Sequence, residues 1–459
     1  MKLICQLDQN LPLPMYEQLY RYIASQISSG QLTFDCKLPS RRELSSLLSV
    51  SESTIKSAYE LLEQEGYIRS SQRRGYFVNR LEPLRDIQSS TVTAADELEP
   101  PNPLYDFSTS ASDASIFPFK LWSKLFREAL FHRPELLQRG NPQGEIELRN
   151  ALSIFLHQYR ALNAQPQNII IGAGADYLLS TLLQMLPKNS IVGAEDPGYH
   201  GIYRNCQRLS MQINPIPTDE NGISADALYN SDSNICYITP SHQFPLGISM
   251  PVGRRRELLR WASEKPNRFI IEDDYDSEFR HFSRPLPALQ GLGLPGQVCY
   301  IGTFSRSLAP SMRLAYMVLP DSLMHRYKIE MIKSGETVSR FDQQTLARFI
   351  SEGYYSRHLR RAGNIYARRL RELLSLLLEI PNTHVFGEQA GLHFLLHVPQ
   401  HGEAELLKRA HKVGIPLHGL SEYYRRLTSP PSTLVLGFAG LKDQDLHGAV
   451  KALRTAWQL

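Results

Sequence analysis

The chain has 459 residues, which is too long for one compact core and predicts about two to four domains. Its 42% hydrophobic and 21% charged residues are ordinary for a soluble globular protein, and its net charge of +4 favours no class of partner. Five scattered cysteines without a CxxC pair argue against a disulfide framework or a zinc site. The N-terminus lacks the apolar core of a signal peptide, and no stretch approaches the ~18 apolar residues of a membrane helix, so we expect a cytoplasmic protein.

A first amphipathic helix is predicted within PMYEQLYRYIASQISSGQL, at residues 14–32. Gly30 ends the pattern, since glycine commonly terminates helices. The apolar and aromatic side chains recur at the spacing of one helical face, at Tyr16, Leu19, Tyr20, Ile23 and Ile27.

Two further helices follow at the spacing of a helix-turn-helix. Ser40 and Glu43 predict a capping box at the start of the first, in which each side chain bonds the other residue's backbone N–H. The buried face of this helix is predicted at Leu44, Leu47 and Leu48. After a turn at residues 49–50, Ser51 is placed to cap the next helix, which ends at Gly66. The inward face of that helix is predicted at Ile55, Ala58, Tyr59 and Leu62.

A basic hairpin follows these helices. Short β runs at residues 67–70 and 76–78 flank the sequence QRRG, which places Arg73 and Arg74 at the tip of the predicted hairpin. From residue 66 to residue 80 there are four arginines and no acid, whereas residues 81–104 carry five acids and one arginine. The basic end of the first domain therefore meets an acidic connector.

The surface of this first domain is suited to DNA. The outward face of the third helix carries small polar and cationic side chains that fit a major groove, namely Ser53, Thr54, Lys56 and Ser57. Arg41 and Arg42, at the start of the second helix, lie with the hairpin arginines where phosphates would pass. Glu52 fits such a surface least, because its carboxylate would repel phosphate; it could accept from a cytosine amino group or face solvent. The alternative is a three-helix packing module whose basic tip is only a solvated loop.

The stretch LPSRRELSSLLSVSESTIKSAYELLEQEGYIRSSQRRGYFV resembles the winged helix-turn-helix of the GntR family of bacterial regulators. The resemblance extends over residues 11–79 and implies a DNA-binding first domain at residues 1–79, with double-stranded DNA as its partner. It also implies a DNA-facing set made of Arg42, Ser51, Ser53, Thr54, Lys56 and the wing around Gly75. Glu52 departs from the family, which often has arginine there, and this leaves room for a different operator preference.

Residues 80–104 predict a flexible linker, since they combine serine, threonine, acids and proline without a sustained period. A random coil of this length spans about 27 Å, enough to let the first domain move relative to the remainder. An ordered path along the larger domain is the alternative.

From residue 105 onward, strand and helix patterns alternate, which predicts an α/β domain with a largely parallel sheet. Short apolar runs predict strands at residues 169–171, 191–192, 235–238, 269–271, 298–301 and 314–319. Helical patterns lie between them, at residues 254–263 and after GAGAD, where the apolar face is Leu178, Leu179, Leu182, Leu183 and Leu186. In such domains ligands bind at the C-terminal ends of the strands.

Four polar motifs follow predicted strands in chain order. GAGAD, at residues 172–176, offers backbone N–H groups and a helix N-terminus to a phosphate. The other three are EDPGY with Tyr199, EDDYDSEF with Asp273 and Tyr275, and GTFSRSLAPSMR with Thr303, Ser305, Arg306 and Arg313. Each alone could be an ordinary loop or a buried salt bridge, but their succession indicates one site.

Together with GNPQGEIELRNAL, TPSHQFPLG and LGFAG, these motifs resemble a fold-type I, aspartate-aminotransferase-like domain over residues 105–459. With the GntR-like head, the whole chain resembles the MocR/GabR group of regulators. The implied fold is multidomain: an α+β winged helix-turn-helix, then an α/β domain of the class I/II aminotransferase type with a large parallel-sheet part and a smaller C-terminal part.

The resemblance implies a site for pyridoxal 5'-phosphate (PLP). Asp273 would pair with the pyridine nitrogen, Tyr275 would bond the ring hydroxyl and Tyr199 would stack on the ring. The phosphate would be held by the backbone amides of Ala173, Gly174 and Ala175 and by Thr303, Ser305 and Arg313.

The resemblance breaks at Arg306. The family's Schiff-base lysine is the fifth residue of GTFSK, and arginine stands there in this chain. Arginine stays protonated and delocalises its charge, so no catalytic residue is predicted and transamination by the usual route should be absent or very slow. The substrate-carboxylate arginine of aminotransferases aligns near Val435, with Arg425 and Arg426 as the nearest arginines.

Three outcomes remain open at this position. PLP, or a preformed PLP–amino acid adduct, binds non-covalently; or Arg306 neutralises a different anionic effector; or its guanidinium pairs with Asp273 and leaves a structural dimerisation domain. The retained ring and phosphate residues favour the first, namely Asp273, Tyr275, Tyr199 and Arg313.

These expectations describe a transcription regulator that binds DNA as a homodimer through residues 11–79 and senses a PLP-related or small amino-compound effector. Two-fold pairing would place two DNA-binding heads on paired half-sites. No membrane or metal site is expected, and the protein would be cytoplasmic, associated with the bacterial nucleoid when it binds DNA. The alternative from another class is a PLP-dependent aminotransferase with an accessory DNA-binding head. In a third alternative, the large domain serves only as a scaffold.

Overall fold

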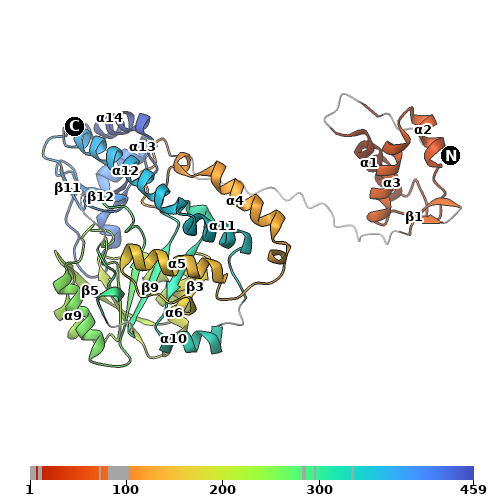
Figure 1. Cartoon of the computed structure of the whole chain (residues 1–459). Coiled ribbons are helices and arrows are strands. Elements are labelled where there is room, and N and C mark those ends of the chain that lie inside the picture. The colour runs from red at the N-terminus through yellow and green to blue at the C-terminus, as the bar shows by residue number, and fades with distance from the viewer. Residues whose placement is uncertain are drawn as a thin grey trace. The chain divides into compact units, whose positions relative to one another are not determined.

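The computed structural model describes residues 7–8, 13–71, 74–80, 103–281, 286–293, 296–331 and 335–459. The chain divides into two compact units, Met1–Pro101 and Asn102–Leu459, whose elements are labelled in Figure 1. Most of the predicted linker, from residue 81 to residue 102, lies outside the described residues.

The described part of the first unit contains three helices and a two-stranded hairpin. The elements are α1 (Met15–Ser28), α2 (Arg41–Leu48), α3 (Glu52–Gln64), β1 (Ile68–Ser71) and β2 (Gly75–Val78). The strands pair antiparallel, with Ile68 opposite Val78. A single apolar cluster joins helices and hairpin through buried side chains that include Leu19, Ile23, Leu44, Ile55, Ala58, Tyr59, Leu62, Ile68 and Val78. The predicted helix-turn-helix and hairpin are therefore confirmed.

The predicted helix caps are present, but one predicted core residue is wrong. Ser40 Oγ accepts from Glu43 N at 3.3 Å, and the Glu43 carboxylate accepts from Ser40 N at 2.7 Å. Leu47 was expected in the core and is 52% exposed. At about 100° per residue, Leu48 lies to one side of Leu44 and Leu47 to the other. Only the side of Leu48 packs against the apolar cluster.

The second unit is built on a mixed sheet. Within the described residues the sheet has eight strands in the order β3-β10-β9-β8-β7-β4-β5-β6. The strands are β3 (Ile169–Gly172), β4 (Ile191–Asp196), β5 (Gln212–Asp219), β6 (Gly222–Ile223), β7 (Ile235–Ile238), β8 (Phe269–Asp274), β9 (Val298–Thr303) and β10 (Ala315–Val318). The run from β5 through β4, β7 and β8 to β9 is parallel, whereas β10 is antiparallel to both of its neighbours. The sheet is thus largely parallel, as predicted.

Two strands of this sheet were not predicted. Strand β5 reads QINPIPTD, and its two prolines hide a strand pattern because proline cannot donate to a ladder. It is nevertheless paired with β4, with Pro215 opposite Ala194 and Pro217 opposite Asp196. Strand β6 has two residues, too few for any periodic signal.

The sheet is buried on both faces. Ile169 and Ile171 contribute to one apolar cluster and Ile170 to another, as the two-residue period of a strand requires. The helices between residues 119 and 377 are α4 (Phe119–His132), α5 (Ile146–Arg160), α6 (Ala175–Met185), α7 (His200–Arg208), α8 (Ala225–Tyr229), α9 (Val252–Ser263), α10 (Asp321–Arg326), α11 (Arg340–Ser351) and α12 (Tyr354–Leu377). Figure 1 shows α5 and α6 crossing the strands. The helix predicted after GAGAD is α6.

A smaller C-terminal part completes the second unit. Its antiparallel sheet has the order β11-β12-β14-β13, with strands β11 (His384–Phe386), β12 (His393–His397), β13 (His418–Gly419) and β14 (Thr433–Gly437). Figure 1 shows β11 and β12 at one end of the unit, beside α13 (Glu403–Lys412) and α14 (Leu446–Trp457). In the described chain no helix is long and apolar enough to span a membrane.

Candidate functional site

The large sheet brings the four polar motifs to one edge. Strands β3, β4, β7, β8 and β9 share one direction, so their C-terminal ends lie together. The register shows how closely they align: Ala315 of β10 is opposite Gly172 on one side and Thr303 on the other. On the next strand, Asp274 is opposite Gly302. The loops that follow these strands therefore surround one point.

A cavity of about 310 Å³ opens at this point. Eight of the ten predicted cofactor residues line it: Ala175, Tyr199, Asp273, Tyr275, Thr303, Ser305, Arg306 and Arg313. The lining residues that sequence reasoning missed are Thr109, Ser110, Asp176, Thr239, Phe244 and Pro310. Asp176 belongs to GAGAD and Thr239 and Phe244 to TPSHQFPLG, so these motifs could have identified them. Thr109 and Ser110 precede α4, far away in the sequence, and carry no such signal.

One end of the cavity is suited to an anion. Gly174 has φ 97°, which favours glycine, and a Cβ there would lie 2.9 Å from Nη2 of Arg313, so the guanidinium lies close beside the first turn of α6. Arg313 itself has a left-handed backbone with φ 50°, a conformation found at ligand sites. Ser305 N donates to Thr303 Oγ1 at 3.1 Å, which brings their hydroxyls to the same place. The amide of Ala173 instead donates to Thr337 Oγ1 at 3.2 Å.

Asp273, which lines the cavity, has one oxygen without a hydrogen-bond partner. Its Oδ2 accepts from the Tyr237 hydroxyl, whereas its buried Oδ1 has no hydrogen-bond partner. Burial raises the pKa of Asp273 to about 7, despite the opposing hydrogen bond from Tyr237. A carboxyl with this pKa holds or releases a proton near neutrality, as groups in functional sites commonly do.

Aromatic rings form the walls of the cavity. The rings of Tyr199 and Tyr275 both meet Phe244 edge-on, at 6.2 Å and 5.9 Å between centroids. The Tyr199 hydroxyl donates to Asp176 Oδ1 at 3.3 Å, and the Tyr275 hydroxyl donates to the His242 carbonyl at 2.9 Å. Burial raises the pKa of both tyrosines, so they remain neutral donors at physiological pH.

Arg306 lines the cavity without a counter-ion. Its Nη1 is buried and has no hydrogen-bond partner. Among the described residues no carboxylate lies within ion-pair distance of it, and the contact with Asp273 considered above is not formed. Burial lowers the pKa of Arg306 and Asp276 opposes this. Arginine nevertheless keeps its charge in proteins.

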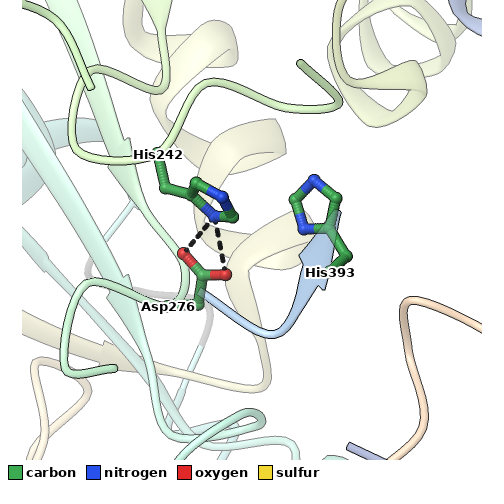
Figure 2. Close-up of side chains that lie close together, drawn as sticks. All are labelled: His242, Asp276 and His393. Carbon is green, nitrogen blue, oxygen red and sulfur yellow. Dashed lines mark hydrogen bonds and ion pairs between the residues drawn. The ribbon is translucent and has the colours of Figure 1, made fainter. Parts of the chain in front are cut away.

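Behind the cavity, His242, Asp276 and His393 form a buried cluster, shown in Figure 2. Nδ1 of His242 lies 3.0 Å and 3.2 Å from the two carboxylate oxygens of Asp276 and 3.0 Å from the Tyr275 hydroxyl. His393 Nε2 is 3.1 Å from the Pro245 carbonyl, and burial lowers the pKa of His393 to about 3. The donor set suits a metal ion, with ligand atoms within 4.8 Å of one another. Its hydrogen bonds instead make it a support that orients Tyr275.

The arginines considered for a substrate carboxylate do not line the cavity. The backbone amides of Arg425 and Arg426 donate to the Asp196 carboxylate at 2.7 Å and 2.9 Å. The Arg425 guanidinium lies 2.7 Å from His200 Nδ1. Val435 is a buried residue of β14.

The predicted DNA-facing residues of the first unit lie mostly at its surface. Those exposed are Arg41, Arg42, Ser51, Ser53, Lys56, Arg74 and Gly75, with Thr54 partly buried. The Ser51 hydroxyl caps α3 and lies 2.7 Å from that of Ser53 and 2.8 Å from that of Thr54. Arg73 lies outside the described residues.

Glu52 has a partner within the same surface. Its carboxylate lies 3.5 Å from Nε of Arg42, with both side chains exposed. Lys56 pairs in the same way with Glu60 at 3.6 Å. Two of the cations predicted to meet DNA therefore carry an acidic partner on the free protein.

Comparison with known proteins agrees with both units. Residues 15–78 match the model of a family described as bacterial regulatory proteins, gntR family. An HTH-type transcriptional regulator of Bacillus subtilis, YhdI, is 38% identical over 98% of this chain and 97% of its own length. The probable rhizopine catabolism regulatory protein MocR of Rhizobium meliloti is 30% identical over 98% of this chain and 95% of its own length. The pyridoxine biosynthesis transcriptional regulator PdxR of Corynebacterium glutamicum is 32% identical over 95% and 93%.

Solved structures support the fold of the large unit. A kynurenine aminotransferase of Pyrococcus horikoshii superposes with a TM-score of 0.69 over 81% of this chain and 95% of its own, at 23% identity. An archaeal alanine:glyoxylate aminotransferase superposes with a TM-score of 0.70 over 77% of this chain and 90% of its own, at 21% identity. At such identities the likeness establishes the aminotransferase fold alone.

Proposed function

Because this chain belongs to the MocR-type transcription regulators of the GntR family, we propose that its aminotransferase-like domain senses a PLP-related ligand without a covalent link. The first unit would read operator DNA, with two chains paired so that two heads meet two half-sites. The name of the C. glutamicum relative, which refers to pyridoxine biosynthesis, is in keeping with a ligand of vitamin B6 chemistry.

One observation supports this proposal most: the cavity combines two features that suit PLP. The first is the buried Oδ1 of Asp273, which has no partner, and the second is Arg313, which lies beside Gly174. The first suits a pyridine N–H and the second a phosphate. PLP bound here would supply its protonated, electron-withdrawing ring. Tyr199 and Phe244 would cover the ring, and Tyr275 would turn its hydroxyl from the His242 carbonyl to the ligand.

The presence of Arg306 in the cavity favours a ligand-sensing function over an enzymatic one. A lysine amine can lose its proton and attack an aldehyde, whereas a guanidinium keeps its proton. The residues that would hold the ring and the phosphate line the cavity, and no lysine is among its lining residues in the described part of the chain. Ligand binding would therefore change the protein's conformational equilibrium without turnover.

The ligand half of the proposal is tested by titrating the dialysed full-length protein with PLP, by calorimetry and absorbance together. We expect saturable binding with the spectrum of the free aldehyde. Asp273→Asn and Arg313→Gln should each weaken it, whereas Glu220→Gln, an exposed acid after β5, should not. Absence of saturable binding, or amino-donor turnover in a steady-state assay that is lost in Asp273→Asn, would contradict the proposal.

The proposed DNA binding is tested by gel shift on the promoter region of the gene that encodes this chain, at several salt concentrations. Arg42→Ala and Lys56→Ala should each weaken binding and reduce the salt slope by about one. Arg21→Ala, which removes an exposed arginine of α1, serves as the charge-matched control. Unchanged affinity and slope in the first two variants would show that the DNA face lies elsewhere.

A further inference from the structure

Arg306 is a half-buried cation that forms no ion pair with the residues that the structure describes. Its Nη1 has no hydrogen-bond partner, and the side chain lines the cavity. The acid whose charge acts most strongly on it is Asp276. Asp276 is already engaged, by His242 at 3.0 Å and 3.2 Å, as Figure 2 shows, and by Leu392 N at 3.2 Å. Among the described residues its ion-pair partner is His242, and no ion pair joins it to Arg306.

The other acids at the cavity are engaged as well. Asp176 accepts from the Tyr199 hydroxyl at 3.3 Å, and Asp273 accepts from the Tyr237 hydroxyl. The cavity thus holds two arginines, and a phosphate beside Arg313 would leave Nη1 of Arg306 without an acceptor of its own. A buried N–H group without an acceptor is costly, so the second arginine calls for a second anionic acceptor.

We infer that Arg306 selects a phosphorylated ring ligand that carries a carboxylate on the side facing Arg306, in preference to the corresponding aldehyde or alcohol. A carboxylate matches the planar fork of a guanidinium with two parallel hydrogen bonds, whereas an aldehyde offers one neutral acceptor. The volume of about 310 Å³ and the aromatic walls limit the ligand to about one ring and its substituents. The inference rests on the proposed function and deepens it, since it names the ligand class of the same site.

The carboxylate could have two sources. It could replace the aldehyde directly on the ring, as in 4-pyridoxic acid 5'-phosphate. It could also belong to an amino acid joined to the phosphopyridoxyl group through a stable secondary amine. The shared chemistry is a phosphate and a carboxylate carried on adjacent positions of one pyridine ring.

The test is a calorimetric titration of the full-length wild type with four probes: PLP, pyridoxine 5'-phosphate, 4-pyridoxic acid 5'-phosphate and N-(5'-phosphopyridoxyl)-alanine. We expect one of the carboxylate probes to bind about ten- to a hundredfold more tightly than the alcohol, as a charge-assisted contact predicts. The tighter of the two carboxylates identifies its source. The comparison uses the wild type, so it does not depend on the folding of a variant.

Two variants assign the preference to Arg306. Arg306→Gln should abolish the carboxylate preference and leave binding of the alcohol within a few-fold of the wild type. Arg313→Gln should weaken all four probes alike, because each carries the phosphate. If the alcohol and both carboxylates bind equally well, or the preference survives in Arg306→Gln, the inference is overturned while the proposed function stands. If no probe binds, the proposed function itself fails.

Discussion

At the scale of single residues, Asp273 shows how burial sets a chemical role. In an unfolded chain an aspartate titrates near pH 4. In the fold, burial raises the pKa of Asp273 to about 7, and one oxygen is left without a donor. A ligand that brings a ring N–H to this oxygen satisfies it and favours the charged form, so binding and protonation are coupled.

A pH prediction follows from this residue. Between pH 4 and pH 7 the folded protein holds the proton of Asp273 and the unfolded chain has lost it, so the free energy of unfolding falls as pH rises through this range. Asp273→Asn cannot ionise. We expect the melting temperature of the unliganded variant to fall less than that of the wild type between pH 5 and pH 8. Glu220→Gln should behave like the wild type, and an equal loss in all three proteins would refute the role given to Asp273.

Glu52 carries a second prediction at this scale. Its carboxylate lies 3.5 Å from Arg42 and would oppose an approaching phosphate. Removing its charge frees Arg42, so Glu52→Gln should raise operator affinity about two- to fivefold at low salt, a modest gain because exposed pairs are weak. Glu17→Gln, which breaks an exposed pair on α1, is the control. A decrease in affinity would mean that Glu52 itself contacts a base.

At the scale of elements, the two short helices of the first unit depend on their caps. Helix α2 has eight residues, too few for helix propensity alone to stabilise it. The capping box of Ser40 and Glu43 satisfies two N-terminal donors, and Leu44 anchors the helix in the core. Local chemistry and one buried contact thus hold the helix that presents Arg41 and Arg42.

Loss of this cap should be measurable as local opening. Ser40→Ala should destabilise α2 by about 1 kcal/mol. That value corresponds to roughly fivefold faster exchange of the α2 amides when exchange is limited by opening. Hydrogen exchange with mass spectrometry on the full chain would resolve it. Ser46→Ala, a change at an exposed position of the same helix, is the control, and equal protection in both variants would argue against the cap.

At the scale of the whole molecule, the chain has two compact units with separate apolar cores. Under the proposed function, ligand binding concerns the larger unit and DNA binding the smaller. Saturation with PLP at 100 times its dissociation constant should stabilise the folded larger unit by about 2.7 kcal/mol. In a thermal scan of the full chain, the transition of that unit should shift upward while the smaller unit's transition stays in place. A shift of both would reveal coupling between the units.

Most of the architecture could be predicted, because its signals are local. The helix caps at Ser40 and Ser51, the leucine period of α6 and the apolar strand runs are encoded within short stretches. The predictions fail at positions where tertiary packing overrides the local sequence pattern. Leu47 belongs to an apolar series yet faces solvent, and β5 forms a strand despite two prolines because β4 offers a partner.

The sequence by itself determined which side chains follow which strands, and through the family resemblance it predicted Arg306 at the position of the Schiff-base lysine, since both depend only on residue order. The folded structure was needed to see that Asp276 bonds to His242, that Asp273 keeps one oxygen without a partner, and that Thr109 and Ser110 line the same cavity. These are contacts between segments distant in the chain, and the sheet register that brings them together is set by long-range pairing.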